Sequence, residues 1–243
     1  TLLASLYTVF GVGMQMSAIQ MTGMARTLGN PMIMPPGSNC TILHGFLLFA
    51  MWWIMMIAMM APSAAPTILL FTALKRKLGG GSVVTIAIWL FLAGYFVLWA
   101  GFSAIAVLLQ WFLVQSDILA AGMMTVKGNI AAGAILVAAG LYQLTPLKRA
   151  CLEQCKSPAQ FLTLNYRAGL KGAFLMGTHH GVYCIGCCWA LMTLLFVGGV
   201  MNLWWIVGLA ALVAFEKFTG PSVILPRVIG LILIAAGGLV AFS

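Results

Sequence analysis

Apolar residues run through most of this 243-residue chain in long uninterrupted stretches, and this restricts the folds open to it. Hydrophobic residues make up 63% of the sequence and charged residues only 6%, whereas roughly 25% of the residues in soluble domains are charged. The runs are continuous rather than alternating, which favours helices, and helices satisfy every backbone hydrogen bond inside a bilayer. The sequence therefore predicts an all-α fold, a polytopic transmembrane helical bundle that forms one domain over residues 1–243.

Proline, glycine and charged residues divide the apolar runs into segments that could each cross a membrane. A crossing helix needs about 20 apolar residues. Seven spans are expected, near residues 2–18, 44–74, 83–112, 129–144, 172–197, 201–215 and 227–242. Pro62 and Pro66 should kink the second span, because proline removes a backbone donor. The polar stretch at residues 145–171 is expected to be the largest loop.

The basic residues divide very unequally between the two sides of a seven-span arrangement. One side collects Lys75, Arg76, Lys77, Lys148, Arg149, Lys156, Arg167, Lys171, Lys217 and Arg227. The other side collects Arg26 and Lys127. Since cytoplasmic loops accumulate Lys and Arg, this split predicts that the N-terminus lies inside and the C-terminus outside. The net charge of +9 then reflects topology and not nucleic-acid binding, so the expected partners are the lipid bilayer and other membrane subunits.

Histidine and cysteine are concentrated at residues 178–189. His180, Cys184, Cys187 and Cys188 fall at i, i+4, i+7 and i+8, which places them on one face of a helix. Imidazole and thiolate ligands favour Cu(I), Zn(II) and iron–sulfur centres. The stripe therefore predicts half of a metal site, to be completed from another span, although buried cysteines also serve as small packing residues.

Two more cysteines and a second histidine could complete such a site. Cys151 and Cys155 have i, i+4 spacing within the polar stretch. They could bind a metal together with His179 or His180, which the topology places in the cytoplasmic half of the membrane. The alternative is a pair of ordinary reduced thiols in the cytosol.

Methionines form a further stripe in the second span. Met51, Met55 and Met59 lie at i, i+4 and i+8, and thioether ligands select Cu(I). Methionine is also a flexible core filler, which is the alternative for Met55 and Met59. More methionines lie in the Pro- and Gly-rich segment of residues 19–43, on the predicted external side where copper would arrive. The expected metal is therefore a transition metal ion, with copper favoured over zinc or iron.

Acidic residues are rare, since Asp117, Glu153 and Glu216 are the only three in the chain. Glu216 stands beside Lys217 at the end of the sixth span, where an ionisable group is a functional candidate. The alternative is a Glu–Lys pair at the membrane interface. The sequence contains no nucleotide-binding loop and no triad or His–carboxylate pattern, so hydrolytic chemistry is not expected.

Three segments together carry a resemblance to a known family, namely Trp52–Pro66, Tyr142–Cys155 and Gly181–Met201. They resemble the bacterial family described as predicted metal-binding integral membrane proteins, over most of the chain from Trp52 to Gly238. The resemblance implies a polytopic helical fold in a bacterial inner (cytoplasmic) membrane. It implies no reaction, because the function of that family is unknown. It also implies a metal held by Cys184, Cys187 and Cys188, and by Cys151 and Cys155.

The function predicted from these features is that of an accessory or assembly subunit. It would hold or pass a soft metal, most favourably copper, within a larger membrane complex. A membrane oxidoreductase that exchanges electrons or disulfides through its cysteines is the alternative. A metal transporter is less favoured, because the third, fourth and seventh spans offer almost no polar residues to line a pathway.

Overall fold

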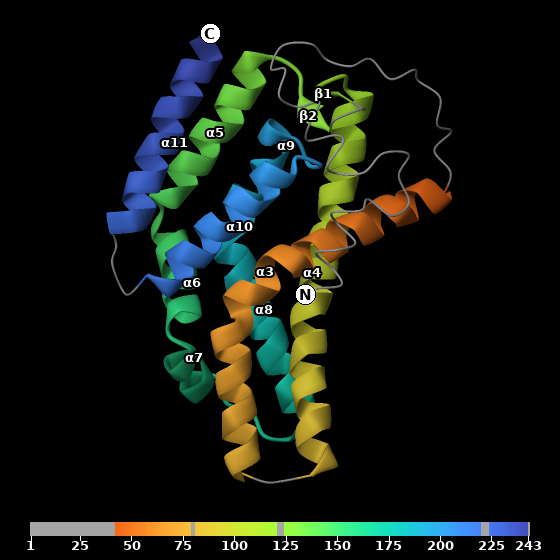
Figure 1. Cartoon of the computed structure of the whole chain (residues 1–243), viewed down its shortest axis with the longest axis vertical. Helices are drawn as coiled ribbons and strands as arrows, with labels where there is room; N and C mark the ends of the chain where they lie inside the picture. The colour runs from red at the N-terminus through yellow and green to blue at the C-terminus, as the bar shows by residue number, and fades with distance from the viewer. Residues whose placement is uncertain (1–41, 79–80, 121–123, 220–223, 243) are drawn as a thin grey trace.

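The structure is a computed structural model that describes residues 42–78, 81–120, 124–219 and 224–242 (Figure 1). The described part is almost entirely helical, which confirms the all-α prediction. Its helices are α3 (Ile42–Leu78), α4 (Ser82–Gln115), α5 (Asn129–Gln143), α6 (Pro146–Lys156), α7 (Pro158–Leu164), α8 (Gly169–Thr193), α9 (Leu195–Gly198), α10 (Leu203–Phe218) and α11 (Ile224–Phe242). Two short antiparallel strands, β1 (Leu119–Ala120) and β2 (Thr125–Val126), connect α4 to α5. The predicted first span, residues 2–18, lies outside the described residues.

The predicted count of about seven spans is not supported. In the described ranges, four helical segments are long and apolar enough to cross a membrane, within α3, α4, α8 with α9, and α11. The bent pair of α5 and α6, which meet at 65°, would make a fifth. A helix rises about 1.5 Å per residue, so the 15 residues of α5 and the 16 of α10 reach about 22 and 24 Å, short of a hydrocarbon core of about 30 Å. The predicted orientation of the termini depended on seven alternating spans and is not supported either.

Helix α3 continues through both of its prolines and changes direction along its length (Figure 1). Pro62 and Pro66 cannot donate backbone hydrogen bonds, which gives the bend a local cause. Met60 and Ser63 are buried beside the prolines, whereas Pro62 and Pro66 themselves are exposed. One side of the bent part of α3 therefore faces the interior of the protein.

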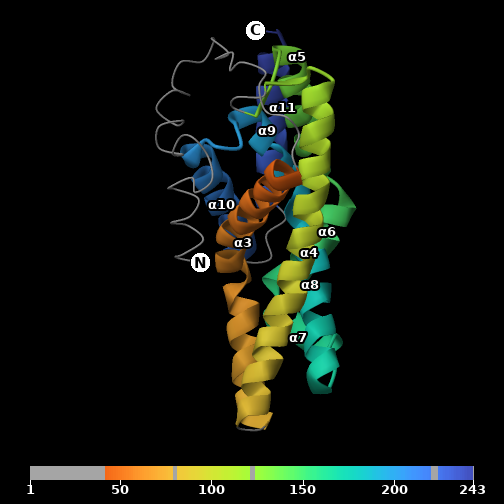
Figure 2. The same cartoon turned by 90° about the vertical axis from the view of Figure 1, so that its right-hand side faces the viewer.

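Glycines allow α4 and α8 to cross in backbone contact, and both views show these helices side by side (Figures 1 and 2). A Cβ atom on Gly177 would overlap the carbonyl oxygen of Phe91, and one on Gly94 would overlap that of Phe174. Small residues at a crossing let two helices approach closely enough for extensive van der Waals packing. This crossing fixes the position of the cysteine-bearing helix α8 against Tyr95 of α4.

Helices α5 and α11 pair in the same way. A Cβ atom on Gly133 would lie 2.6 Å from the carbonyl oxygen of Gly237, and one on Gly140 would lie 2.7 Å from that of Gly230. These contacts recur every seven residues, so they run along the length of both helices. The start of α11 is thereby held next to the junction of α5 and α6.

The polar stretch predicted as the largest loop is instead mostly helical. Thr145 caps α6 by accepting a hydrogen bond from the Lys148 backbone at 3.3 Å, and Pro146 occupies the first helical turn. Helix α6 is amphipathic, and its buried side chains, including Leu152 and Cys155, pack toward α8. Its cysteines therefore belong to a packed helix and not to a loop.

Candidate metal centre

The His–Cys stripe lies on the buried side of α8. His180, Cys184, Cys187 and Cys188 all project from this one helix and are nearly inaccessible to solvent. The helix was predicted from the apolar run around them, and the single face from their i, i+4, i+7 and i+8 spacing. Helices α3, α4, α6 and α10 supply the groups that this face meets.

The closest approach between cysteines from different helices joins α6 and α8. The sulfur atoms of Cys155 and Cys187 are 3.9 Å apart, and both side chains are buried. A disulfide would require about 2.05 Å, so this is a pair of thiols. Two sulfur atoms that share an ion at about 2.3 Å each, with a tetrahedral angle between them, would lie about 3.8 Å apart. The spacing therefore fits two ligands of one metal ion.

A methionine from α3 adds a second contact between sulfur atoms. The Cys188 sulfur lies 3.8 Å from the Sδ atom of Met60. Met55 and Met59, the methionines singled out by their spacing, are buried in the core formed by the same helices. We refer to Met60, Cys155, Cys184, Cys187 and Cys188 as the sulfur cluster.

A buried lysine touches the sulfur cluster from α10. The Lys217 ammonium donates hydrogen bonds to the sulfur of Cys184 and to the hydroxyl of Ser63, each at 3.0 Å. The Tyr95 hydroxyl lies 3.2 Å from the same Cys184 sulfur. A cation beside a sulfur atom stabilises the thiolate, the form that binds metals. The cluster thus combines soft ligands with a built-in positive charge.

Next to Lys217, Glu216 is part of a separate buried charge network. One of its carboxylate oxygens accepts a hydrogen bond from the Lys148 ammonium at 2.7 Å, and the other accepts one from the Gln143 amide at 3.0 Å. Both partners of the ion pair are almost fully buried. The suggested interfacial pair between Glu216 and Lys217 is therefore wrong, because consecutive side chains on a helix point in different directions.

The two histidines of the stretch have different surroundings. His179 is exposed, and its Nδ1 atom lies 3.4 Å from the Asn165 side-chain oxygen. His180 is buried among the rings of Phe91, Tyr95 and Phe161, with ring centroids 5.1 to 6.3 Å away. Its Nδ1 atom has no hydrogen-bond partner among the described residues. His180 therefore lies beside Tyr95 and one helical turn from Cys184. The neighbours of its ring are aromatic rings and not sulfur atoms.

Cys151, the remaining predicted ligand, is half-buried against the backbone of α8. Its sulfur would lie 2.7 Å from a Cβ atom on Gly186. The carbonyl oxygen of Gly186 accepts a hydrogen bond from the Tyr142 hydroxyl. Cys151 thus fills the space that the absent side chain of Gly186 leaves, next to the sulfur cluster.

The sulfur cluster offers soft ligands in pairs. The described residues contain no assembled group of three or more His, Cys, Asp or Glu side chains that could hold a metal, and the sulfur atoms approach one another in the pairs Cys155–Cys187 and Cys188–Met60. Pairs of thiols with a thioether nearby are the ligands that Cu(I) prefers. The sulfur cluster is therefore a candidate for binding Cu(I).

Two participants were not among the predicted site residues. Lys217 could have been suspected, because an ionisable residue in a strongly apolar stretch is a functional candidate by default. Nothing in the sequence distinguishes Met60 as a ligand, since it closely follows four other methionines, Met51, Met55, Met56 and Met59. Met60 is identified only by the packing of α3 against α8, which brings its sulfur to Cys188.

A family model matches most of the chain. The family whose model matches residues 49–240 is PpoB2, described as a copper chaperone. No curated protein and no solved structure matches the chain. The matched range includes every residue of the sulfur cluster, and it supports the metal-related character implied by the resemblance.

Proposed function

The chain belongs to the PpoB2 family, which is described as a copper chaperone, and on that premise we propose that this protein carries Cu(I) in the sulfur cluster. Copper is the cargo, which the protein holds and then passes to a partner. The observation that carries the proposal is the 3.9 Å approach of Cys155 on α6 to Cys187 on α8. Thiols from separate helices meet there in the interior, and the neighbouring Cys188 lies 3.8 Å from the Sδ atom of Met60.

The charges around the cluster favour a monovalent ion. Metal binding requires the cysteines to lose their protons, so two thiolates with Cu(I) carry one net negative charge. The Lys217 ammonium, 3.0 Å from Cys184, balances that charge. With Zn(II) the same two thiolates are already neutral, and Lys217 becomes an unbalanced buried cation, which is costly.

We place the protein in a membrane, as the sequence predicts for a bacterial inner membrane. Four apolar helical segments of sufficient length support this placement. Large apolar side chains on the outer surface support it too, for example Trp89, Trp204 and Leu239, since water-soluble surfaces rarely expose extensive apolar patches. A protein of this kind would act as an accessory subunit that delivers copper to other membrane-associated proteins.

Metal analysis tests the proposal. We expect the full chain, purified in detergent under reducing conditions without chelator, to contain stoichiometric copper. The double substitution Cys155→Ser with Cys187→Ser should lower the copper content at least about tenfold, because a hydroxyl is a poor ligand for a soft ion. The matched control is Cys151→Ser, which removes a neighbouring thiol on α6 that lies against Gly186. It should keep most of the copper.

Two results would overturn the copper assignment. One is a wild-type protein that contains no copper, or zinc in its place. The other is a double variant that retains the metal, which would place the site elsewhere. Either outcome is read from the same elemental analysis, with monodisperse elution as the check on folding.

The close thiol pair also favours a second function, a dithiol that exchanges electrons with a partner. Oxidation would join the Cys155 and Cys187 sulfurs in a disulfide, release two protons and pass two electrons to an acceptor disulfide. Mass spectrometry of the intact chain separates the two functions. A metal-free protein that loses two hydrogens on oxidation, and regains them with a thiol reductant, would support the oxidoreductase.

Lys217→Met should change the choice of metal. We expect the affinity for Cu(I) to fall about tenfold, or about 1.4 kcal/mol, while the affinity for Zn(II) stays constant or rises. Competition with chelators of known affinity measures both constants. Lys171→Met, which removes an exposed lysine near the start of the cysteine-bearing helix α8, is the control and should change neither affinity. An equal loss of affinity for Cu(I) and for Zn(II) would instead indicate that Lys217 has a purely structural role.

A further inference from the structure

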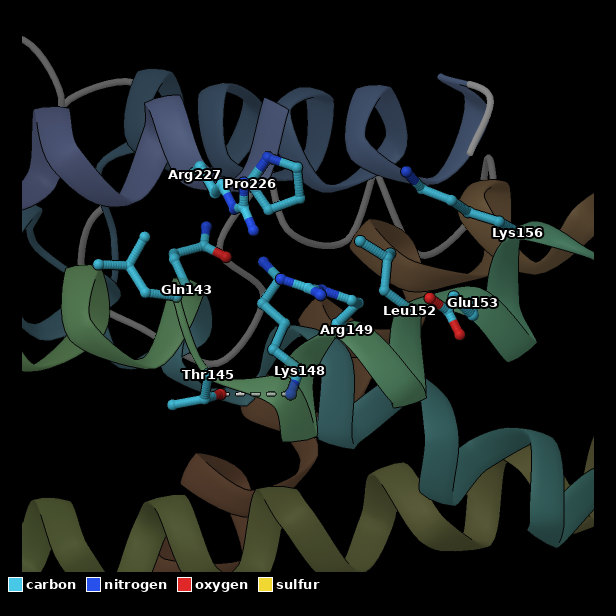
Figure 3. Close-up of a pocket in the computed structure, with 10 residues that line it drawn as sticks. Gln143, Thr145, Lys148, Arg149, Leu152, Glu153, Lys156, Pro226 and Arg227 are labelled. Carbon is cyan, nitrogen blue, oxygen red and sulfur yellow. Dashed lines mark hydrogen bonds between the residues drawn. The ribbon is translucent and has the colours of Figure 1, made fainter. Parts of the chain in front are cut away.

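A pocket separate from the sulfur cluster opens where α5, α6 and α11 meet (Figure 3). It encloses about 440 Å³ of empty space, part of which is open to the outside. The end of α5 lines one wall, α6 lines the floor and the first turn of α11 lines the opposite wall. Only about 40 Å³ of that space can hold the centre of a water-sized molecule, so the pocket suits a compact group such as one anion.

Positive charge dominates the lining. Lys148, Arg149, Lys156 and Arg227 contribute four cations, and Glu153 contributes the one acid among the lining residues. The charge of Lys148 is already balanced by Glu216, with which it forms a buried ion pair. Arg149 and Arg227 are exposed, and among the described residues neither makes an ion pair or a hydrogen bond through its side chain. Figure 3 shows them on facing helices, α6 and α11, at the same pocket.

Two helices begin at this pocket. Thr145 caps α6, and Pro226 lies in the first turn of α11. The first turn of a helix presents unpaired backbone N–H groups and the positive end of the helix dipole, which together attract anions. The backbone therefore adds to the field of the arginines.

The buried side-chain amide of Gln143 is an independent indication that this pocket binds a ligand. Gln143 is 4% exposed, and its amide nitrogen is committed to Glu216. Its Oε1 atom lacks a hydrogen-bond partner among the described residues. Figure 3 shows this amide pointing into the space between α6 and the start of α11. A buried acceptor without a donor is costly, so the matching ligand brings a hydrogen-bond donor.

We propose that this pocket binds a phosphate-type anion that also carries a hydrogen-bond donor. Arg149 and Arg227 would hold the anionic oxygens from two sides, since guanidinium groups match phosphate geometry. Gln143 would accept the hydrogen bond from the donor. Such chemistry is found in a lipid headgroup such as phosphatidylglycerol and in free hydrogen phosphate, and basic pockets between membrane helices bind lipid headgroups in this way.

The test uses the full chain with two probes. Inorganic phosphate is titrated calorimetrically into the delipidated protein in neutral detergent. In parallel, the protein is placed in nanodiscs with equal amounts of phosphatidylglycerol and phosphatidylcholine, and retained lipid is counted by native mass spectrometry. The variant is Arg149→Gln with Arg227→Gln. Its matched control is Arg76→Gln with Arg167→Gln, two exposed arginines outside the pocket.

We expect the pocket variant to bind its anion at least about tenfold more weakly than the wild type, and the control to match the wild type. Calorimetric binding of inorganic phosphate would identify a soluble ligand, whereas selective retention of phosphatidylglycerol would identify a lipid. Binding of neither probe by the wild type, or equal binding by the pocket variant, would overturn the proposal. The single variant Arg227→Gln repeats the test if the double variant is unstable. Copper content should be unchanged in all variants, because none of them touches the sulfur cluster.

Discussion

Lys148→Met is expected to lower the free energy of unfolding by about 3 to 5 kcal/mol, because it leaves the Glu216 carboxylate buried without its cation. Lys148 is 1% exposed, and its ammonium lies 2.7 Å from that carboxylate. Equilibrium unfolding in mixed micelles measures the change.

A double-mutant cycle shows whether the ion pair is the cause. Lys148→Met combined with Glu216→Gln removes both charges and keeps an acceptor for the Gln143 amide. The double variant should be more stable than Lys148→Met alone. If the losses of stability in the two single variants simply added in the double variant, the ion pair would not be the cause. Lys171→Met, at an exposed position, should change stability by less than about 0.5 kcal/mol.

Gly177→Ala is expected to cost at least about 3 kcal/mol, at the upper end of the range for an overpacked interior. The added methyl group would overlap the Phe91 carbonyl oxygen, a backbone atom that cannot rotate away. Helices α4 and α8 would have to separate, which also moves Tyr95 away from Cys184. We therefore expect both a lower unfolding midpoint and a loss of bound copper.

Gly101→Ala is the matched control on α4. Nothing lies within 4 Å of a Cβ atom at this position. Alanine in a helix interior is more favourable than glycine by up to about 1 kcal/mol. This variant should be as stable as the wild type or slightly more stable. A similar loss of stability in both variants would show that the α4–α8 crossing is not the cause.

The helix that carries the cysteines could be predicted from sequence because its signal is local. An apolar run predicts α8, and a 3.6-residue period places His180, Cys184, Cys187 and Cys188 on one face. The partners of that face depend on how other helices pack, which no local pattern encodes. Cys155 is a candidate ligand because of its i, i+4 spacing with Cys151, but its approach to Cys187 follows from the packing of α6 against α8.

The span count failed for a different reason. Apolar composition alone does not separate a helix long enough to cross a membrane from a shorter apolar helix, as α10 shows. The polar stretch at residues 145–171 was predicted as a loop because its charges broke the apolar pattern. The start signal of α6, Thr145 followed by Pro146, was present in the sequence and indicates a helix.

The adjacent charges at the end of α10 also determine the rotation of that helix about its own axis. Apart from Glu216 and Lys217, no side chain from Leu203 to Phe218 is charged, so apolar burial alone would tolerate many rotations about the helix axis. Successive residues point about 100° apart. A shift by one residue in one direction would turn Lys217 toward Lys148, and a shift in the other direction would turn Glu216 toward the cysteine sulfurs. Either shift would break both the ion pair with Lys148 and the contact of Lys217 with Cys184, so this pair of residues specifies one register for α10.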